Sequence, residues 1–317
     1  MSLPLIDPSD VAQPAGFVAE KILKLGQSSM RAALRQWRNP TDAEQPGEPT
    51  PPEELLHDFR VELRRLRVWV HQTRTLVRTR RQARLDLRHF AQATNPTRDL
   101  EVILTLLEAW HATRQPVPEQ PSTLITEVLE RLDRAAYPVD HLTLTGLAPR
   151  PRKGKHPVFG EWLSVQLGAQ QQMIRYLTQQ TDAELHQARI HVKHLRYLIE
   201  PLAGFPVAAA LITLLKNMQT QLGSLHDLAV FRQTVPELVQ APVAQALRTV
   251  LEVSGRQTVD IKRVFAAQRE ETLDVVRWQT DRYQSIIKDW QRTRDAQMQR
   301  LDEQLDQLCR ELVPTKK

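Results

Sequence analysis

Apolar side chains recur at every third or fourth position along most of the chain, and this spacing predicts an all-α protein. No stretch shows the sustained alternation of apolar and polar residues that is typical of a β-strand. Residues 53–94 are expected to form one long helix or two helices in line, ended by Asn95 and Pro96. The other expected helices cover residues 15–38, 97–114, 121–136, 159–180, 183–203, 207–222, 225–239 and 242–265.

Proline, glycine and basic residues gather between Tyr137 and Pro157, and we interpret this segment as a basic linker between two halves. Within it, Arg150–His156 is a cationic cluster that is expected to be mobile. Each half carries about four helices, so the sequence predicts two repeats that resemble four-helix bundles. The expected boundaries are an N-terminal tail at 1–14, repeat 1 at 15–136, the linker at 137–157, repeat 2 at 158–265 and a C-terminal helical extension at 266–317.

The C-terminal region is predicted to form one long helix, because residues 256–312 contain neither glycine nor proline. Its apolar residues follow heptad spacing at Met298, Leu301, Leu305, Leu308 and Leu312. This pattern leaves two alternatives open. The helix either folds back on the body of the protein or pairs with another chain, in a homodimer or with a partner protein.

One basic pattern, His-x-x-Arg-x-x-x-(Arg/Lys)-x-x-Arg, occurs twice, 129 positions apart (186 − 57). Steps of three, four and three residues place all four side chains on one face of a helix. A row of cations repels itself, so the pattern indicates that a polyanion neutralises it. The two copies are His57, Arg60, Arg64 and Arg67, and then His186, Arg189, Lys193 and Arg196.

The duplication extends beyond this motif. Leu87-Arg88 corresponds to Leu215-Lys216, and Arg98-Asp99-Leu100 corresponds to His226-Asp227-Leu228, both at an offset of 128 (215 − 87). At the expected helix break Asn95 is equivalent to Gly223, and both residue types can end a helix in a left-handed conformation. Matched charges and matched helix ends indicate an internal repeat.

The first basic row continues past its motif, and an apolar row lies about 100° around the same helix. The cations are therefore expected to border a groove. Arginine suits phosphate because its planar fork donates two parallel hydrogen bonds. Histidines of ordinary pKa would add charge below about pH 6.5 and strengthen binding. The continuation is His71, Arg74, Arg78, Arg81 and Arg88, the apolar row is Leu56, Phe59, Leu63, Leu66 and Val70, and a similar basic row on the first helix contains Lys21, Lys24, Arg31 and Arg35.

The amino-acid composition limits the classes of partner that the protein can bind. The 317 residues carry a net charge of +6 and a pI near 9.6, which favours acidic partners. Cys309 is the single cysteine, so disulfides within the chain and cysteine-based metal sites are excluded. The N-terminal residues lack the pattern of a signal peptide, and no apolar stretch approaches the ~20 residues of a membrane-spanning helix. A cytoplasmic protein is expected, without a cofactor and without membrane attachment.

These motifs resemble the CHAD domain family, a helical, histidine-bearing domain of polyphosphate-associated proteins. The resemblance covers about residues 15–265 and uses the segments His57–Arg67, Arg98–Val102, His186–Glu200 and Leu222–Val230. It implies two four-helix repeats related by pseudo-twofold symmetry, with basic residues around a central groove that binds inorganic polyphosphate. It also implies location on polyphosphate granules.

By position, the resemblance implies that the eight motif residues contact the ligand, with Arg98, Arg88 and Lys216 as a second tier. The chain departs from the family pattern at Asn95, where glycine is usual, and at His226, where asparagine is common. The triphosphate tunnel domain often fused to this family is marked by Glu-x-Glu-x-Lys, and that motif is absent here. No catalytic domain is therefore implied.

Two alternatives remain. A nucleic-acid-binding helical protein would share the charge, but 5% aromatic residues provide few platforms for base stacking. A metal-dependent phosphohydrolase is suggested by His57-Asp58 and His226-Asp227. Against this, the cations occur in both copies of the repeat, whereas each His-Asp pair occurs in one copy only. The sequence thus favours a non-catalytic polyphosphate-binding protein, with nucleic acid disfavoured as the specific ligand.

Overall fold

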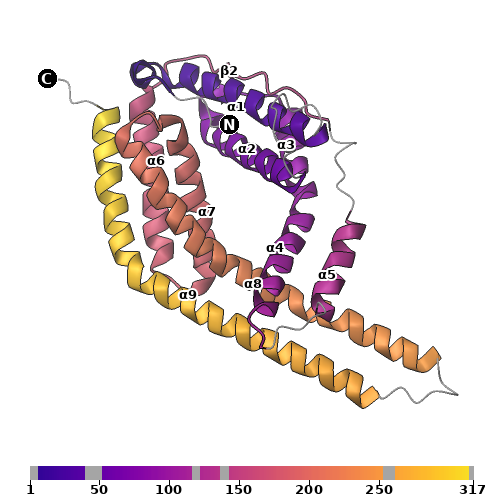
Figure 1. Cartoon of the computed structure of the whole chain (residues 1–317). Coiled ribbons are helices and arrows are strands. Elements are labelled where there is room, and N and C mark those ends of the chain that lie inside the picture. Colours follow the sequence, from indigo (N-terminus) through magenta and orange to yellow (C-terminus); the bar gives the residue numbers. More distant parts are fainter. Residues whose placement is uncertain (1–5, 40–51, 116–121, 136–142, 253–260, 314–317) are drawn as a thin grey trace, which may run out of the picture. The chain divides into compact units, whose positions relative to one another are not determined.

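The computed structural model describes residues 6–39, 52–115, 122–135, 143–252 and 261–313, and within them the fold is all-α apart from one short strand pair. The chain forms two compact units (Figure 1). Unit 1 contains Met1–Thr94, Pro138–Leu222 and Thr293–Lys317, and unit 2 contains Asn95–Tyr137 and Gly223–Arg292. Each unit combines segments from both expected halves, so a compact unit is not the same thing as a sequence repeat. The repeat boundaries and the pseudo-twofold symmetry stay predictions.

Unit 1 is built on two helix pairs, α1 with α2 and α6 with α7 (Figure 1). The expected first helix is confirmed at its predicted bounds, because its apolar positions are buried along one face. In the core of the unit, Trp69 is 1% exposed and donates through Nε1 to the carbonyl of Tyr197 at 3.0 Å. The elements are η1 (Pro8–Ala12), α1 (Ala15–Arg38), α2 (Pro52–Gln72), α3 (Arg81–Ala93), α6 (Phe159–Thr178), α7 (Asp182–Ile199), η4 (Glu200–Leu202), the first part of α8 (Pro206–Glu252) and the end of α9 (Ile261–Leu312).

The expected helix over residues 53–94 is wrong in its middle. Between α2 and α3 the chain forms a 3₁₀ turn, η3 (Thr73–Thr75), and a short strand, β1 (Val77–Arg78). Leu76 and Val77 are both buried, and threonine and valine in this stretch restrict the helical rotamers. The basic row of the sequence is therefore not one continuous helix face.

The basic linker is anchored rather than mobile in its described part. Its strand β2 (Arg150–Pro151) pairs antiparallel with β1, and Leu147 is 1% exposed. Backbone hydrogen bonds run from Arg80 N to Leu147 O at 3.0 Å and from Arg152 N to Leu76 O at 2.8 Å. These bonds satisfy the backbone groups that a buried loop would otherwise leave unpaired.

The expected break at Gly223 is also wrong. Helix α8 runs without interruption from Pro206 to Glu252, with Gly223 and Pro236 inside it. Among the described residues, positive φ values occur at Ala148 and Gly154, so neither Asn95 nor Gly223 is left-handed. A glycine inside a helix costs only about 1 kcal/mol relative to alanine. Continuous packing offsets that cost, since buried residues follow in steps of three or four at Leu211, Leu215, Met218, Leu222, Leu225, Leu228, Phe231, Val235 and Leu238.

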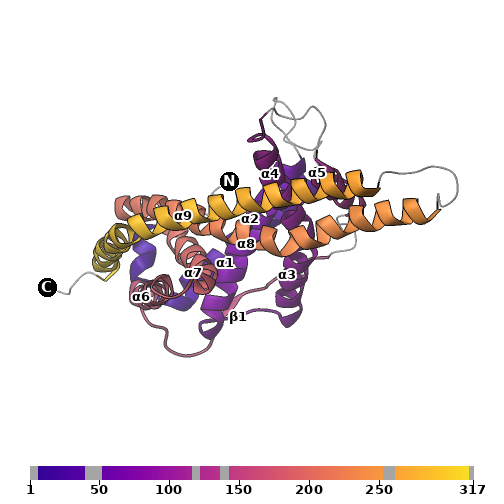
Figure 2. The ribbon, with the colours of Figure 1, turned by 90° about the horizontal axis from the view of Figure 1, so that it is seen from below.

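Unit 2 contains α4 (Asn95–His111), α5 (Thr123–Arg134) and the facing parts of α8 and α9, which run side by side (Figures 1 and 2). Its core contains Trp110, whose Nε1 donates to the carboxylate of Asp274 at 3.2 Å. The other members are Ile103, Leu107, Leu124, Ile125, Val128, Phe231, Val235, Leu238 and Val275.

The long C-terminal helix is confirmed as α9, and its heptad face is buried within the chain itself. Leu301, Leu305, Leu308 and Leu312 are each at most 1% exposed. In unit 1 the C-terminal part of α9 packs against α6, where Gln171 donates to Asp302 at 2.6 Å. Of the two alternatives, the helix folds back on the body.

This contact depends on Gly160 in the first turn of α6. A Cβ at this position would lie 2.1 Å from the carbonyl oxygen of Leu312. We expect Gly160→Ala to reduce the free energy of unfolding by about 1–3 kcal/mol through overpacking. The matched control is Gly168→Ala on the same helix, where a Cβ meets open space. This control should stabilise the protein by about 0.5–1 kcal/mol. Chemical denaturation of both variants measures the difference, and equal effects would contradict the close contact.

Candidate functional site

The main candidate site is a cleft of about 500 Å³ in unit 1, formed by α2 and α7. Arg64 and Arg67 come from the first copy of the motif and Lys193 comes from the second. The other lining residues are Val68, His71, Gln72, Ile190, His194 and Tyr197. We name this site the α2–α7 cleft. Its lining contains no carboxylate, so the three cations face a space without a negative protein charge.

A second hollow of about 350 Å³ adjoins the cleft, between α2 and α3. Arg67 and His71 line both sites, so the two are continuous. This α2–α3 hollow is lined by Arg67, Val70, His71, Arg74, Arg84, Leu87 and Arg88, again without a carboxylate. Together the two sites form an extended basic surface rather than a pocket for a single small anion.

The charges on this surface are not neutralised by acidic side chains. Desolvation by the surrounding protein, together with Arg88 and Arg64 nearby, lowers the pKa of Arg67. Within the part of the chain that the structure describes, none of these three arginines forms an ion pair with a carboxylate. Their mutual repulsion destabilises the ligand-free protein, and a polyanion would relieve it.

Two histidines of unit 1, His186 and His194, are harder to charge than ordinary histidines. Burial, followed by the neighbouring His191, His71 and Arg67, lowers the pKa of His194 to about 4. Burial and then Arg189 and Lys193 lower the pKa of His186. Without a ligand His194 is therefore neutral at pH 6.5. A bound polyanion would raise the pKa values of these histidines. Binding should therefore become tighter as pH falls from the pKa of the bound state toward the pKa of the ligand-free state.

Two motif arginines are buried and donate to protein acceptors. Arg60 is 7% exposed and its Nη1 donates to the carbonyl of Thr94, at the C-terminal end of α3. Arg196 is also 7% exposed, donates to Glu200 at 2.6 Å and lies 4.6 Å over the ring of Tyr197. Both side chains therefore hold helices in place and do not line the cleft.

Glu200 is the centre of a buried ion cluster that joins α2 to the end of α7. Its Oε2 accepts from Arg65 Nε at 2.7 Å, and its Oε1 accepts from Arg196. Arg65 also pairs with Glu62, which is buried, and burial raises the pKa of that carboxyl. Two acids and two arginines thus form a locally neutral cluster, which fixes the two helices that carry the cleft.

The remaining motif positions are outside the linings of these two sites. His57 is exposed, whereas His186 and Arg189 are half-buried, and none of the three lines the cleft or the hollow. The structure brings together Arg64, Arg67, Lys193 and Arg88 from the sequence-based set.

The cations of α1 and Lys216 stand outside the two sites. Lys21 pairs with Asp10 and Lys24 pairs with Glu20, each at 2.7 Å. Lys216 is exposed on α8. Arg31 and Arg35 are exposed on α1 and line neither the cleft nor the hollow.

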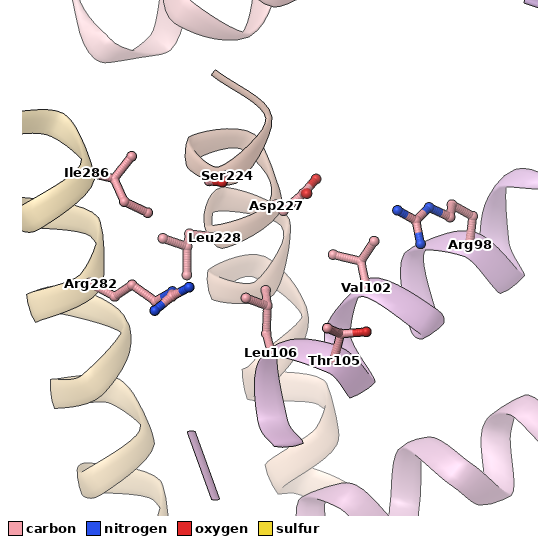
Figure 3. A pocket seen from close by; sticks show the side chains of 9 residues that line it. All are labelled: Arg98, Val102, Thr105, Leu106, Ser224, Asp227, Leu228, Arg282 and Ile286. Carbon is pink, nitrogen blue, oxygen red and sulfur yellow. The ribbon is translucent and has the colours of Figure 1, made fainter. Parts of the chain in front are cut away.

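Arg98 belongs to unit 2, where it lines a separate pocket of about 140 Å³. Figure 3 shows its guanidinium and the carboxylate of Asp227 pointing toward one another from α4 and α8. Arg98 also pairs with Glu101 at 3.7 Å. A carboxylate thus pairs with this cation, unlike those of the α2–α7 cleft.

Four basic lining residues were not among the predicted contacts: His71, Arg74, Arg84 and His194. His71 and Arg74 continue the seven-residue rhythm of the basic row, so that signal could have found them. Arg84 lies off this rhythm and comes from α3, and the fold of residues 73–80 brings it to the hollow.

The two His-Asp pairs of the phosphohydrolase alternative fall in different units, His57-Asp58 in unit 1 and His226-Asp227 in unit 2. In the described ranges there is no group of three or more histidine, cysteine, aspartate or glutamate residues that could hold a metal ion. None of the described helices is long and apolar enough to cross a membrane.

Comparison with known proteins gives a family and two structural likenesses. Residues 28–236 match the CHAD domain. The fold is similar to the crystal structure of the CHAD domain from the plant Ricinus communis, with a TM-score of 0.48, 17% identity and coverage of 96% of this chain and 94% of that chain. It is also similar to PptA from Streptomyces chartreusis, with a TM-score of 0.49, 15% identity and coverage of 87% and 100%. No curated protein matches the chain.

His194 should make stability depend on pH. Its pKa is about 4 in the folded protein and near 6.5 when unfolded, so the unfolded state binds more protons between these values. The free energy of unfolding should therefore fall by about 2–3 kcal/mol as pH drops from 6.5 to 4. In His194→Gln this contribution disappears. Urea denaturation of both proteins across the pH range measures it, and parallel curves would refute the assignment.

Glu200 should contribute strongly to stability because it pairs with buried Arg196 and half-buried Arg65. We expect Glu200→Gln to lower the free energy of unfolding by about 3–5 kcal/mol, since a buried charge loses its partner. The control is Glu130→Gln, which removes an exposed pair with Arg134 and should cost less than about 1 kcal/mol. Similar losses in the two variants would show that the buried cluster has no special role.

Proposed function

Because this chain belongs to the CHAD domain family, which is linked to polyphosphate binding, we propose that it binds inorganic polyphosphate on the basic surface of unit 1. The observation that carries this proposal is the lining of the α2–α7 cleft. Arg64 and Arg67 from one copy of the motif meet Lys193 from the other, and no carboxylate lines the same space.

A linear polyanion fits this surface better than a single phosphate. The cleft continues into the α2–α3 hollow through Arg67 and His71, so cations follow one another over an extended path. Each successive phosphate of a polymer can accept hydrogen bonds from a different guanidinium. The repulsion among Arg64, Arg67 and Arg88 then favours binding, because successive phosphates of the polymer would neutralise these three side chains.

Phosphate polymer is favoured over nucleic acid because the cleft has little to offer a base. Its lining contains no phenylalanine or tryptophan, and its tyrosine, Tyr197, is 2% exposed and already covered by the guanidinium of Arg196. Binding of single strands usually relies on exposed rings on which bases stack. The surface therefore supplies charge without a means of reading a base.

The proposed role is retention of the polymer rather than its turnover. Arginine and lysine bind phosphate through charge and hydrogen bonds and require no cofactor. Divalent cations bound to the polymer would weaken this attraction by neutralising part of the negative charge of the polymer. We further propose that the protein is located on polyphosphate granules in the cytoplasm.

The decisive experiment measures binding of long-chain polyphosphate to the wild type and to Arg67→Gln/Lys193→Gln. Both side chains line the cleft, so their loss should weaken binding about tenfold or more and reduce the dependence on salt. The control is Lys288→Gln/Arg300→Gln, which removes two exposed cations from α9 and should change affinity little. Single-stranded RNA serves as the competitor.

Specific binding predicts that RNA displaces polyphosphate poorly from the wild type. Equal losses in the cleft variant and the control would mean a diffuse electrostatic attraction and would contradict the proposed site. Displacement by RNA at equal phosphate concentration would instead favour a nucleic-acid-binding protein.

A further inference from the structure

The linker and the α2–α3 connection together form a second concentration of positive charge in unit 1. Residues 73–85 contain five arginines and residues 143–158 contain two arginines and two lysines, and neither segment contains an acidic residue. We name these two segments the basic clip. The cations are Arg74, Arg78, Arg80, Arg81, Arg84, Arg150, Arg152, Lys153 and Lys155, and all of them are exposed.

Strand pairing brings like charges of the clip face to face. In the register of β1 and β2, Arg78 lies directly opposite Arg150. Residues directly opposite in an antiparallel pair have neighbouring side chains on the same face, and like charges in such positions are destabilising. No described carboxylate forms an ion pair with either arginine. An external anion between the two arginines would therefore relieve this repulsion.

The backbone of the clip is held firmly although its cations repel each other. Thr145 N donates to Asp86 Oδ2 at 2.8 Å, and Leu147 N donates to Gln27 Oε1 at 2.6 Å. The first bond also occupies Asp86, the acidic residue closest in sequence to the clip arginines of α3. Buried Leu147 and Val77 anchor the two segments. The cations are thus presented on a fixed scaffold.

The clip is continuous with the candidate site. Arg74 and Arg84 belong to the clip and also line the α2–α3 hollow. From the linker side, Arg152 Nε donates to the carbonyl oxygen of Arg74 at 3.1 Å. Cations therefore succeed one another from the α2–α7 cleft, through the hollow, to the β1–β2 pair.

We infer that the basic clip is a second polyphosphate-binding segment, which extends the cleft and makes the protein select long chains over short ones. This inference rests on the proposed function of the cleft. A short oligophosphate can occupy the cleft alone, whereas a long chain also neutralises the opposed arginines of the clip. Each additional contact releases counterions, so affinity for long chains depends more steeply on salt.

The test uses the full chain with tripolyphosphate and with long-chain polyphosphate as separate ligands. The clip variant is Arg78→Gln/Arg150→Gln/Lys153→Gln/Lys155→Gln. It retains every residue that lines the cleft or the hollow. The control, Arg232→Gln/Arg269→Gln/Lys288→Gln/Arg300→Gln, removes the same four charges from exposed positions of α8 and α9. Circular dichroism and thermal unfolding establish that each variant is folded.

We expect the clip variant to bind tripolyphosphate like the wild type and to lose about tenfold in affinity for the long chain, with a shallower salt dependence. The control should retain long-chain affinity. Equal long-chain losses in the clip variant and the control, or a parallel loss of tripolyphosphate binding, would overturn the inference. Failure of the proposed function is a different result, in which the wild type binds neither ligand or Arg67→Gln/Lys193→Gln binds both normally.

Discussion

The basic surface of unit 1 depends on one buried carboxylate. Glu200 accepts hydrogen bonds from Arg65 of α2 and from Arg196 of α7, and so it neutralises charge at the place where the two helices meet. Cations on adjacent helices repel each other, so another interaction must hold the two helices together. The cluster around Glu200, with the bond between Trp69 and Tyr197, supplies that attraction. Arg64, Arg67 and Lys193 can then face the cleft without acidic partners.

The two copies of the basic motif have taken different roles. Arg67 and Arg196 occupy equivalent positions, but Arg67 is exposed in the cleft whereas Arg196 is buried against Glu200. The residue equivalent to Glu200 in the first copy is His71, at the same offset of 129 (200 − 71). An acid one turn further along the helix neutralises the arginine in one copy. A histidine in the other copy leaves its arginine available for a ligand.

The linker is a structural element of unit 1. Its backbone bonds to the α2–α3 connection replace the helical bonds that residues 73–80 do not make. The same contacts place linker cations next to those of the hollow. A segment that composition alone describes as a basic connector thus becomes part of the basic surface of unit 1.

The sequence by itself determined the helical class, the first helix, the long C-terminal helix and the duplicated basic motif, because each depends on local periodicity. Apolar residues also continue at helical spacing on both sides of Gly223, and this spacing indicates the single helix α8 although glycine is typical of helix ends. Tertiary structure decided which cations face the cleft, since Arg60 and Arg64 lie on the same helix face but Arg60 reaches Thr94. It also decided the path of residues 73–80 and the burial of the C-terminal heptad face. Those outcomes depend on partners distant in sequence, namely the linker strand, Glu200 and α6, and local periodicity carries no information about such contacts.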